Sequence, residues 1–136
     1  MAAILQVETR GRRAIDLTAK IAEIVAASGA AGGLAHLFIQ HTSASLTVQE
    51  NADPDVMADL IDWLDRTAPE DGPYRHRAEG PDDMPAHLKS AMTATSLSLP
   101  FENGRLLLGT WQAVYLLEHR RAPQKRRIVV TLVPAI

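Results

Sequence analysis

Histidines and carboxylates are the residues of this sequence whose types and spacing could do chemistry. Five histidines occur, and three of them, His41, His76 and His87, stand at the end of an apolar run, in a Pro- and Gly-rich segment and on a short helical pattern. None belongs to a sequential zinc motif such as H-E-x-x-H. Three separate elements can nevertheless supply most of the roughly four nitrogen or oxygen ligands of a zinc site. The alternative is that each histidine caps or anchors its own loop.

The other two histidines have simpler interpretations. His36 lies inside the apolar run LAHLFIQ, which is typical of a strand histidine held by a hydrogen bond. His119 opens the basic run HRRAPQKRR, residues 119–127, which is either a solvated hairpin loop or an anion site, because the Arg fork matches phosphate oxygens. Nucleic-acid binding is not expected, because no aromatic residue is interleaved in this run and the net charge is −2.

Two further polar stretches are Glu50-Asn51 and, much later in the chain, Gly109-Thr110-Trp111-Gln112. Either Glu50 is a solvated strand end and Asn51 caps the next helix, or both residues belong to a site. Glycine at 109 permits close backbone approach, so we expect Trp111 to line a polar pocket; the alternative is a β-bulge with a core tryptophan. Asp55 and Asp59 are four residues apart, so they share a helical face and their like charges repel each other. Either this face is exposed to solvent or a cation between the two carboxylates relieves the repulsion.

The stretch HTSASLTVQEN, residues 41–51, has His41 at one end and Glu50 and Asn51 at the other. About eight residues of straight strand at ~3.3 Å each keep His41 and Glu50 far apart. Either the chain turns at Ser43–Ala44 and brings the two ends together, or they serve different parts of a site, across a subunit boundary for example.

Composition sets limits on the function. The 136 residues fit one domain, and the hydrophobic share of 46% supports a core. The absence of cysteine excludes disulfides, thiolate metal sites and cysteine nucleophiles. P-loop, Rossmann and G-x-S-x-G motifs do not occur. Without a signal-like or membrane-length apolar run, we expect a soluble cytoplasmic protein.

The elements that must position these residues form an α+β pattern in one domain, 1–136, with a mainly antiparallel sheet. The Asn103-Gly104 pair predicts a hairpin turn, and Pro54 suits the first turn of the second helix. The long segment 67–83 has no periodicity, which is often a sign of a functional loop. The pattern predicts helices over 19–27, 53–66 and 84–92, a turn at 11–13, and strands over 3–9, 34–40, 45–49, 96–99, 105–108, 112–118 and 127–133.

Three ordered blocks, HTSASLTVQENADPDV, YRHRAEGPDDMPAHLKS and NGRLLLGTWQAVYLLEHR, resemble the signature blocks of the YjbQ (UPF0047) family. The resemblance covers nearly the whole chain. It implies a mixed, barrel-like curved sheet with two to three helices, assembly as a homotrimer and secondary thiamine-phosphate synthase activity. Many relatives have Asn at the position of Asp83. The polar positions carried over are His41, Thr42, Ser43, Glu50, Asn51, Asp55, His76, Asp83, His87, Gly109, Thr110, Trp111, Gln112 and Glu118.

On this resemblance, the first hypothesis is a thiamine-phosphate synthase, a transferase that couples a pyrimidine diphosphate to a thiazole phosphate and releases pyrophosphate. A divalent metal, zinc or magnesium, would be held by His41, His76 and His87, with Asp83 as a further ligand. Lys89 and Arg105 would face phosphate. The catalytic set implied in this way is Glu50, Asn51, Lys89, Trp111, Gln112 and Glu118, with Trp111 and Gln112 on the heterocycle and Glu50 or Glu118 orienting a histidine.

Two alternatives stand beside this hypothesis. One is a trimeric metal- or small-anion-binding protein whose catalysis is weak or incidental. The other is a metal-dependent hydrolase of a phosphorylated metabolite. The expected partner is a small phosphorylated metabolite, with no nucleic acid and no membrane.

Overall fold

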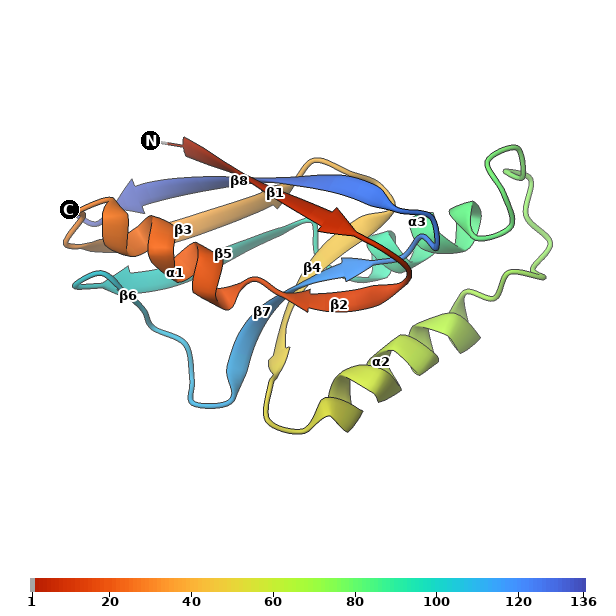
Figure 1. The fold of residues 1–136 in the computed structure, drawn as a ribbon, viewed down its shortest axis with the longest axis horizontal. Coiled ribbons are helices and arrows are strands. Elements are labelled where there is room, and N and C mark those ends of the chain that lie inside the picture. Colours follow the sequence, from red (N-terminus) through yellow and green to blue (C-terminus); the bar gives the residue numbers. More distant parts are fainter. Residues whose placement is uncertain (1) are drawn as a thin grey trace.

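A computed structural model describes residues 2–136, which form eight strands and three helices (Figure 1). The helices are α1 (Thr18–Ala27), α2 (Pro54–Thr67) and α3 (Asp83–Met92). The strands are β1 (Ala2–Thr9), β2 (Arg13–Asp16), β3 (Gly32–Ile39), β4 (Ala44–Glu50), β5 (Ser96–Glu102), β6 (Arg105–Leu106), β7 (Gln112–Glu118) and β8 (Gln124–Pro134).

The strands form two antiparallel sheets. The larger has the order β1-β8-β3-β5-β6, and the smaller has the order β2-β7-β4. The chain passes from the larger sheet to the smaller three times, from β1 into β2, from β3 into β4 and from β6 into β7, and the two sheets curl around a common interior as a half-barrel (Figure 1). Among residues 2–136 every strand pair is antiparallel. The sheets are therefore purely antiparallel, whereas the resemblance implied a mixed sheet.

The main core lies between the two sheets. Successive side chains of a strand point to opposite faces, and in β3 and β8 alternate residues are buried while their neighbours are partly or fully exposed. Helix α1 covers the same interior with Leu17, Ile21 and Val25, all fully buried. The core residues from the sheets include Val7, Ala35, Leu37, Ile39, Leu46, Phe101, Val114, Leu116, Ile128 and Val130.

Strand β7 is buried on both faces, which explains its nearly continuous apolar run AVYLL. Val114 and Leu116 belong to the main core. Leu117 points to the opposite side, where it meets Ile61 and Leu64 of α2. Helices α2 and α3 therefore cover the outer side of the smaller sheet and bring their polar residues to the end of β7.

Local sequence accounts for the ends of several elements. Asp53 caps α2 by accepting the Asp55 backbone N–H at 2.9 Å, and Pro54 occupies the first turn. Asn103 and Gly104 both have positive φ, 51° and 76°, as a tight hairpin turn between β5 and β6 requires. Among residues 2–136, no helix is both long enough and apolar enough to cross a membrane.

The predicted α+β class and single-domain curved sheet are confirmed. Each predicted helix and strand is present, with some shifted boundaries: β6 ends at Leu106, whereas the sequence predicted a strand to Leu108. Strand β2 was not predicted. Its four residues carry no fully buried side chain, and it forms only because its backbone pairs with β7.

Candidate metal centre

Two histidines and one carboxylate converge where the 67–82 loop meets α3. His76 Nε2 lies 2.6 Å from Asp83 Oδ2, and His87 Nε2 lies 3.1 Å from the same oxygen. One ligand atom from each residue lies within 4.8 Å of the other two. Asp83 and His87 are four residues apart on α3, so they share a helical face, and the loop brings His76 over that face.

The hydrogen bond on the other side of the His87 ring fixes its tautomer. Nδ1 lies 2.8 Å from the Thr42 carbonyl oxygen, which can only accept, so Nδ1 carries a hydrogen. In the neutral ring, Nε2 then presents a lone pair toward the Asp83 carboxylate. A cation between these two groups, or a second proton on the ring, is needed to make that approach favourable. Metal-ligating histidines are commonly held in this way by a backbone carbonyl.

Asp83 is held in its charged form. Its carboxylate is nearly buried, and Arg120 Nη1 donates to Oδ1 at 2.6 Å while Oδ2 faces the histidines. Burial by itself raises the pKa of Asp83, but the hydrogen bond from His76 and the charges of His87 and Arg120 outweigh it and lower the pKa below its usual value. An acid at this position therefore contributes a full negative charge to the centre.

Arg120 ties the His76 loop to the rest of the molecule. Its Nε donates to Asp82 Oδ2 at 3.2 Å, and its Nη2 donates to the Glu79 carbonyl at 3.0 Å. The next residue, Arg121, donates its backbone N–H to Asp82 Oδ2 at 2.9 Å and forms an ion pair with Glu70. The start of the basic run thus binds carboxylates of its own chain. The sequence did not predict Arg120 as a positioning residue. Its one signal was the presence of two adjacent arginines, Arg120-Arg121, and two adjacent aspartates, Asp82-Asp83, in the same chain.

His41 lies outside this group in the single chain. Its Nε2 accepts the Arg127 backbone N–H at 2.8 Å, and its Nδ1 lies 3.3 Å from Arg126 Nη1. Burial and the Arg126 charge lower the pKa of His41, which keeps the ring neutral. Because Nε2 accepts from Arg127, the hydrogen of the neutral ring is on Nδ1, which cannot also accept from Arg126. The chain therefore brings together three of the four predicted ligands, His76, Asp83 and His87, and holds His41 against β8.

Glu118 and Arg126 form a buried ion pair behind His41. Arg126 donates through Nε and Nη2 to the two carboxylate oxygens at 2.7 and 2.5 Å, and Thr9 Oγ1 donates to Glu118 at 2.5 Å. Burial raises the pKa of Glu118, but these hydrogen bonds lower it overall. Arg126 also donates to the Ser43 carbonyl and hydroxyl. Glu118 thus binds Arg126, which lies beside His41, and its predicted role in orienting a histidine stays a prediction.

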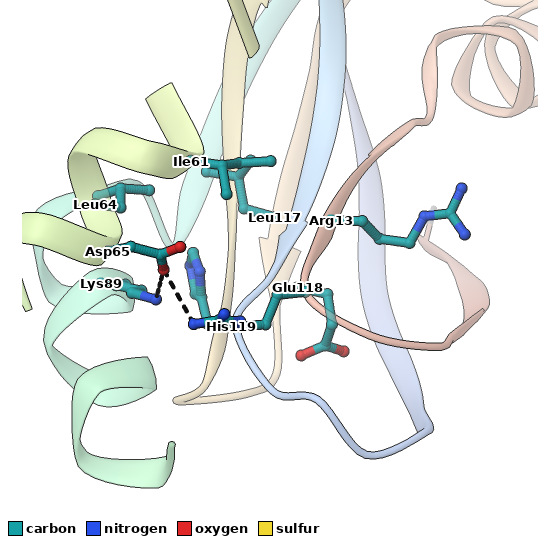
Figure 2. A pocket seen from close by; sticks show the side chains of 9 residues that line it. Arg13, Ile61, Leu64, Asp65, Lys89, Leu117, Glu118 and His119 are labelled. Atoms are coloured by element: carbon teal, nitrogen blue, oxygen red, sulfur yellow. Dashed lines mark hydrogen bonds and ion pairs between the residues drawn. The ribbon is translucent and has the colours of Figure 1, made fainter. Parts of the chain in front are cut away.

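Lys89, predicted to face phosphate, is buried and paired with a carboxylate of its own chain. Its side chain is 4% exposed, and Nζ donates to Asp65 Oδ1 at 2.5 Å (Figure 2). Arg12 Nη1 donates to the same oxygen at 3.1 Å. Beside them lies His119, hydrogen-bonded through Nε2 to Ser45 Oγ at 2.8 Å, and its burial lowers its pKa to about 4. This cluster joins α2 and α3 to the end of β7.

Glu50 and Asn51 lie beside Trp111 and Gln112, at the opposite end of the smaller sheet. In the β4–β7 ladder Ala44 pairs with Glu118 and Glu50 pairs with Gln112, so roughly six residues, or ~20 Å, separate the two ends. The chain does not fold back at Ser43–Ala44. Glu50 Oε2 accepts the Asp53 N–H, and the Trp111 carbonyl accepts the Asn51 N–H at 3.0 Å.

Trp111 is 62% exposed, so the core alternative for this residue is wrong. The Gln112 amide oxygen accepts the Gly109 N–H at 2.8 Å, which closes the turn before β7. His36, paired with Ser98 at 2.9 Å, and His119 both lie outside the metal-ligand group, as predicted. Arg105 is exposed on β6, in the larger sheet.

Comparisons with known proteins point to one family. A family model described as "UPF0047 protein YjbQ-like" matches residues 3–135. UPF0047 protein sll1880 from Synechocystis sp. is 52% identical over 93% of this chain and 87% of its own length. UPF0047 protein YjbQ from Escherichia coli O157:H7 is 54% identical over 74% of this chain and 72% of its own length. The crystal structure of a conserved hypothetical protein, TT1486, from Thermus thermophilus is similar with a TM-score of 0.87 and 39% identity, covering 96% of this chain and 99% of that one.

Proposed function

Because the chain belongs to the UPF0047 YjbQ-like family, whose names state no activity, we propose a function from the site: a divalent-metal protein that acts on a small anionic metabolite. The observation that carries this proposal is the convergence of His76, Asp83 and His87, with the His87 tautomer set so that Nε2 offers a lone pair. The three residues supply two imidazole nitrogens and one carboxylate oxygen.

This donor set fits zinc better than magnesium. Zinc accepts imidazole nitrogens and carboxylate oxygens, and catalytic zinc sites use three protein ligands with one position open. Magnesium prefers oxygen ligands in near-ideal octahedral geometry. Two of the three donors here are nitrogens, so zinc or a similar transition metal is the proposed ion.

The chain supplies the positioning around that ion. When bound, a divalent metal polarises a phosphoryl oxygen and stabilises the charge of a departing phosphate group. Asp83 offsets one of its two positive charges, which leaves a net attraction for an anion. Lys89, Arg120 and Arg126 each pair with a carboxylate of the chain, so these three cations are not free to hold the anion, and the metal would supply charge for it.

The specific reaction that we propose first is the coupling of a pyrimidine diphosphate to a thiazole phosphate with release of pyrophosphate. The metal centre supports it because the diphosphate is the group that needs charge stabilisation. Trp111 and Gln112 would contact the heterocycle only from a second copy of the chain, since their own end of β4 lies ~20 Å away.

A second candidate is a metal- and anion-binding protein with incidental catalysis. The internal pairing of Lys89, Arg120 and Arg126 favours it, because a phosphate-transferring site normally keeps a cationic side chain free for the leaving group. Metal-assisted hydrolysis of a phosphorylated metabolite would use the same centre.

One assay separates these functions. Purified protein is analysed for metal, and turnover of the two thiamine precursors is then measured with and without chelator. Chelator-sensitive coupling supports the synthase, metal without turnover supports the binding protein, and phosphate release without coupling supports the hydrolase.

The matched variants are His76→Ala, which should lose the metal, and His36→Ala, which should keep it. Equal metal content in these two variants would refute the metal centre.

We propose in addition that the chain assembles as a closed homo-oligomer, with the trimer that the family resemblance implies. The outer face of the larger sheet supports this. Ile4, Leu34, Phe38 and Val133 are large apolar side chains exposed on adjacent strands β1, β8 and β3. Exposed apolar patches of this kind are typical of association surfaces.

A further inference from the structure

A cleft of about 530 Å³ lies between the end of β1, the strand β2 and the start of β8. A short turn joins β1 to β2, but the two strands pair into different sheets and therefore diverge (Figure 1). The cleft shares no residue with the metal-ligand group. Its volume falls within the range of small-molecule sites, which are roughly 300–1,000 Å³.

Three cationic residues, Arg10, Arg13 and Lys125, line this cleft. All three are exposed, and none forms an ion pair with a carboxylate among residues 2–136. Successive residues of a strand point to opposite faces, so β8 buries Arg126 in an ion pair and turns Lys125 to the cleft. Figure 2 shows the Arg13 side chain directed away from Lys89. The three cations are therefore free to meet a ligand.

The charges of the cleft do not cancel. Glu8 is the one carboxylate residue among residues 2–136 that lines it, and it lies opposite Lys125 in the β1–β8 ladder. Three cations and one carboxylate leave two positive charges in excess. Like charges gathered in a concave surface repel each other, and such a cleft concentrates anions. A ligand with two or more negative charges would offset this excess.

We propose that this cleft is a second ligand site, which binds a small polyanion with two or more phosphate or carboxylate groups and needs no metal ion. Arg10 and Arg13 present planar forks that match the oxygens of either group, and Lys125 adds a third charge. No aromatic side chain of residues 2–136 lines the cleft, so it offers a nucleic acid no stacking surface. This site goes beyond the proposed metal function and does not depend on it.

Two probes, tripolyphosphate and the tricarboxylate tricarballylate, test this proposal. Each is titrated by calorimetry into protein freed of metal on a chelating resin, in about 0.1 M salt, where charges farther than about 10 Å are largely screened. The double variant Arg13→Gln/Lys125→Gln should weaken binding of the tighter probe about tenfold or more, because it removes hydrogen bonds to charged groups. The matched double variant Lys20→Gln/Arg66→Gln removes the same charges at exposed positions outside the cleft and should leave the affinity nearly unchanged.

The outcomes distinguish this cleft from the metal centre. His76→Ala should bind the probe as wild type does, because the cleft and the metal-ligand group share no residue. Whichever probe binds more tightly identifies the anionic group of the ligand. The proposal is overturned if neither probe binds, if the two double variants lose affinity equally, or if His76→Ala loses the probe. A tetraglutamate peptide that binds more tightly than both probes would overturn it in favour of an acidic protein segment. None of these results alters the zinc content, which tests the metal function separately.

Discussion

At the scale of single residues, the decisive feature is that neighbouring groups fix the tautomer or the ionisation of the candidate ligands. The Thr42 carbonyl sets the tautomer of His87, and Arg120 holds Asp83 as a carboxylate with one oxygen turned to the histidines. These two contacts convert side chains that are common on any surface into a directed donor set. They come from the β3–β4 turn and the β7–β8 turn, which are distant from α3 in sequence.

Replacing Arg120 by Ala should weaken zinc binding by about 10- to 100-fold, the usual cost of removing a group that orients metal ligands. The physical reason is that Asp83 and the His76 loop both lose their anchor. Zinc affinity is measured by competition with a chromophoric chelator, and Arg10→Ala, at an exposed position, is the matched control. An unchanged zinc affinity in a folded Arg120→Ala protein would contradict the positioning role.

His119 should make the protein less stable in mild acid. Its pKa is 6.5 in the unfolded reference and about 4 in the fold, because the ring is buried. The unfolded chain therefore binds more protons than the folded one between these values, and stability falls as pH drops through this window. The full effect between pH 7.5 and 5 is about 2 kcal/mol.

Urea unfolding at pH 7.5 and 5 checks this expectation for wild type and His119→Gln. Glutamine stays neutral at both pH values and can still hydrogen-bond Ser45, so the variant should lose most of the pH dependence. A smaller acid sensitivity should remain, because the pKa of His41 is also lowered by burial. Equal pH dependence in both proteins would mean that His119 is not the responsible group.

At the scale of elements, the β4–β7 ladder decides how the polar residues are distributed. It holds Glu118 and His119 near α3 and holds Glu50, Asn51 and Gln112 at its far end. A straight antiparallel ladder cannot bring its two ends together, so one chain carries two separate polar groups. Helix α3 and the loop before it complete only the first group.

Trp111, at the far end of this ladder, should be dispensable for stability. It is 62% exposed, so Trp111→Ala should cost less than about 1 kcal/mol, whereas Phe101→Ala, at a fully packed core position, should cost about 3–5 kcal/mol. Thermal or urea unfolding of both variants measures the difference. Trp111→Phe should likewise keep the fold while weakening ligand binding if a second copy places this ring at a metal centre. A large loss of stability in Trp111→Ala would contradict its surface position.

At the scale of the whole molecule, the half-barrel buries its inner faces and leaves the outer face of the larger sheet uncovered among residues 2–136. Helices α2 and α3 cover the smaller sheet, and α1 packs on the shared core (Figure 1). The alternation of β3 places Leu34 and Phe38 outward, beside Val133 and Val129 of β8. An exposed apolar face of this kind supports the proposed oligomer, because association would remove it from water.

Sedimentation at micromolar concentration should show a closed oligomer, with a trimer as the expected species. Leu34→Glu, which places a charge in the centre of the apolar outer face, should shift it toward monomer. Ala58→Glu, at an exposed position of α2, should not. Circular dichroism of both variants confirms that each is folded. A wild-type protein that sediments only as monomer would refute the assembly.

The sequence by itself determined the elements, because they depend on local patterns: alternation in β3, the Asp53 cap and Pro54 of α2, and the Asn103-Gly104 turn. It also singled out His41, His76 and His87 as candidate ligands, to which the family resemblance added Asp83. Strand β2 was not predicted, because its four exposed or partly exposed residues show no alternation of buried and exposed positions that would indicate a strand.

Only the tertiary structure decided which polar residues meet. Arg120 reaches Asp83 across 37 positions of sequence, and Arg126 reaches Ser43 across 83. No local pattern encodes such pairings. The structure likewise turned His41 toward β8, buried Lys89 against Asp65 and left Trp111 exposed. The physical reason is that a charged side chain takes the nearest partner that packing offers, and the sheet register sets which partner is near.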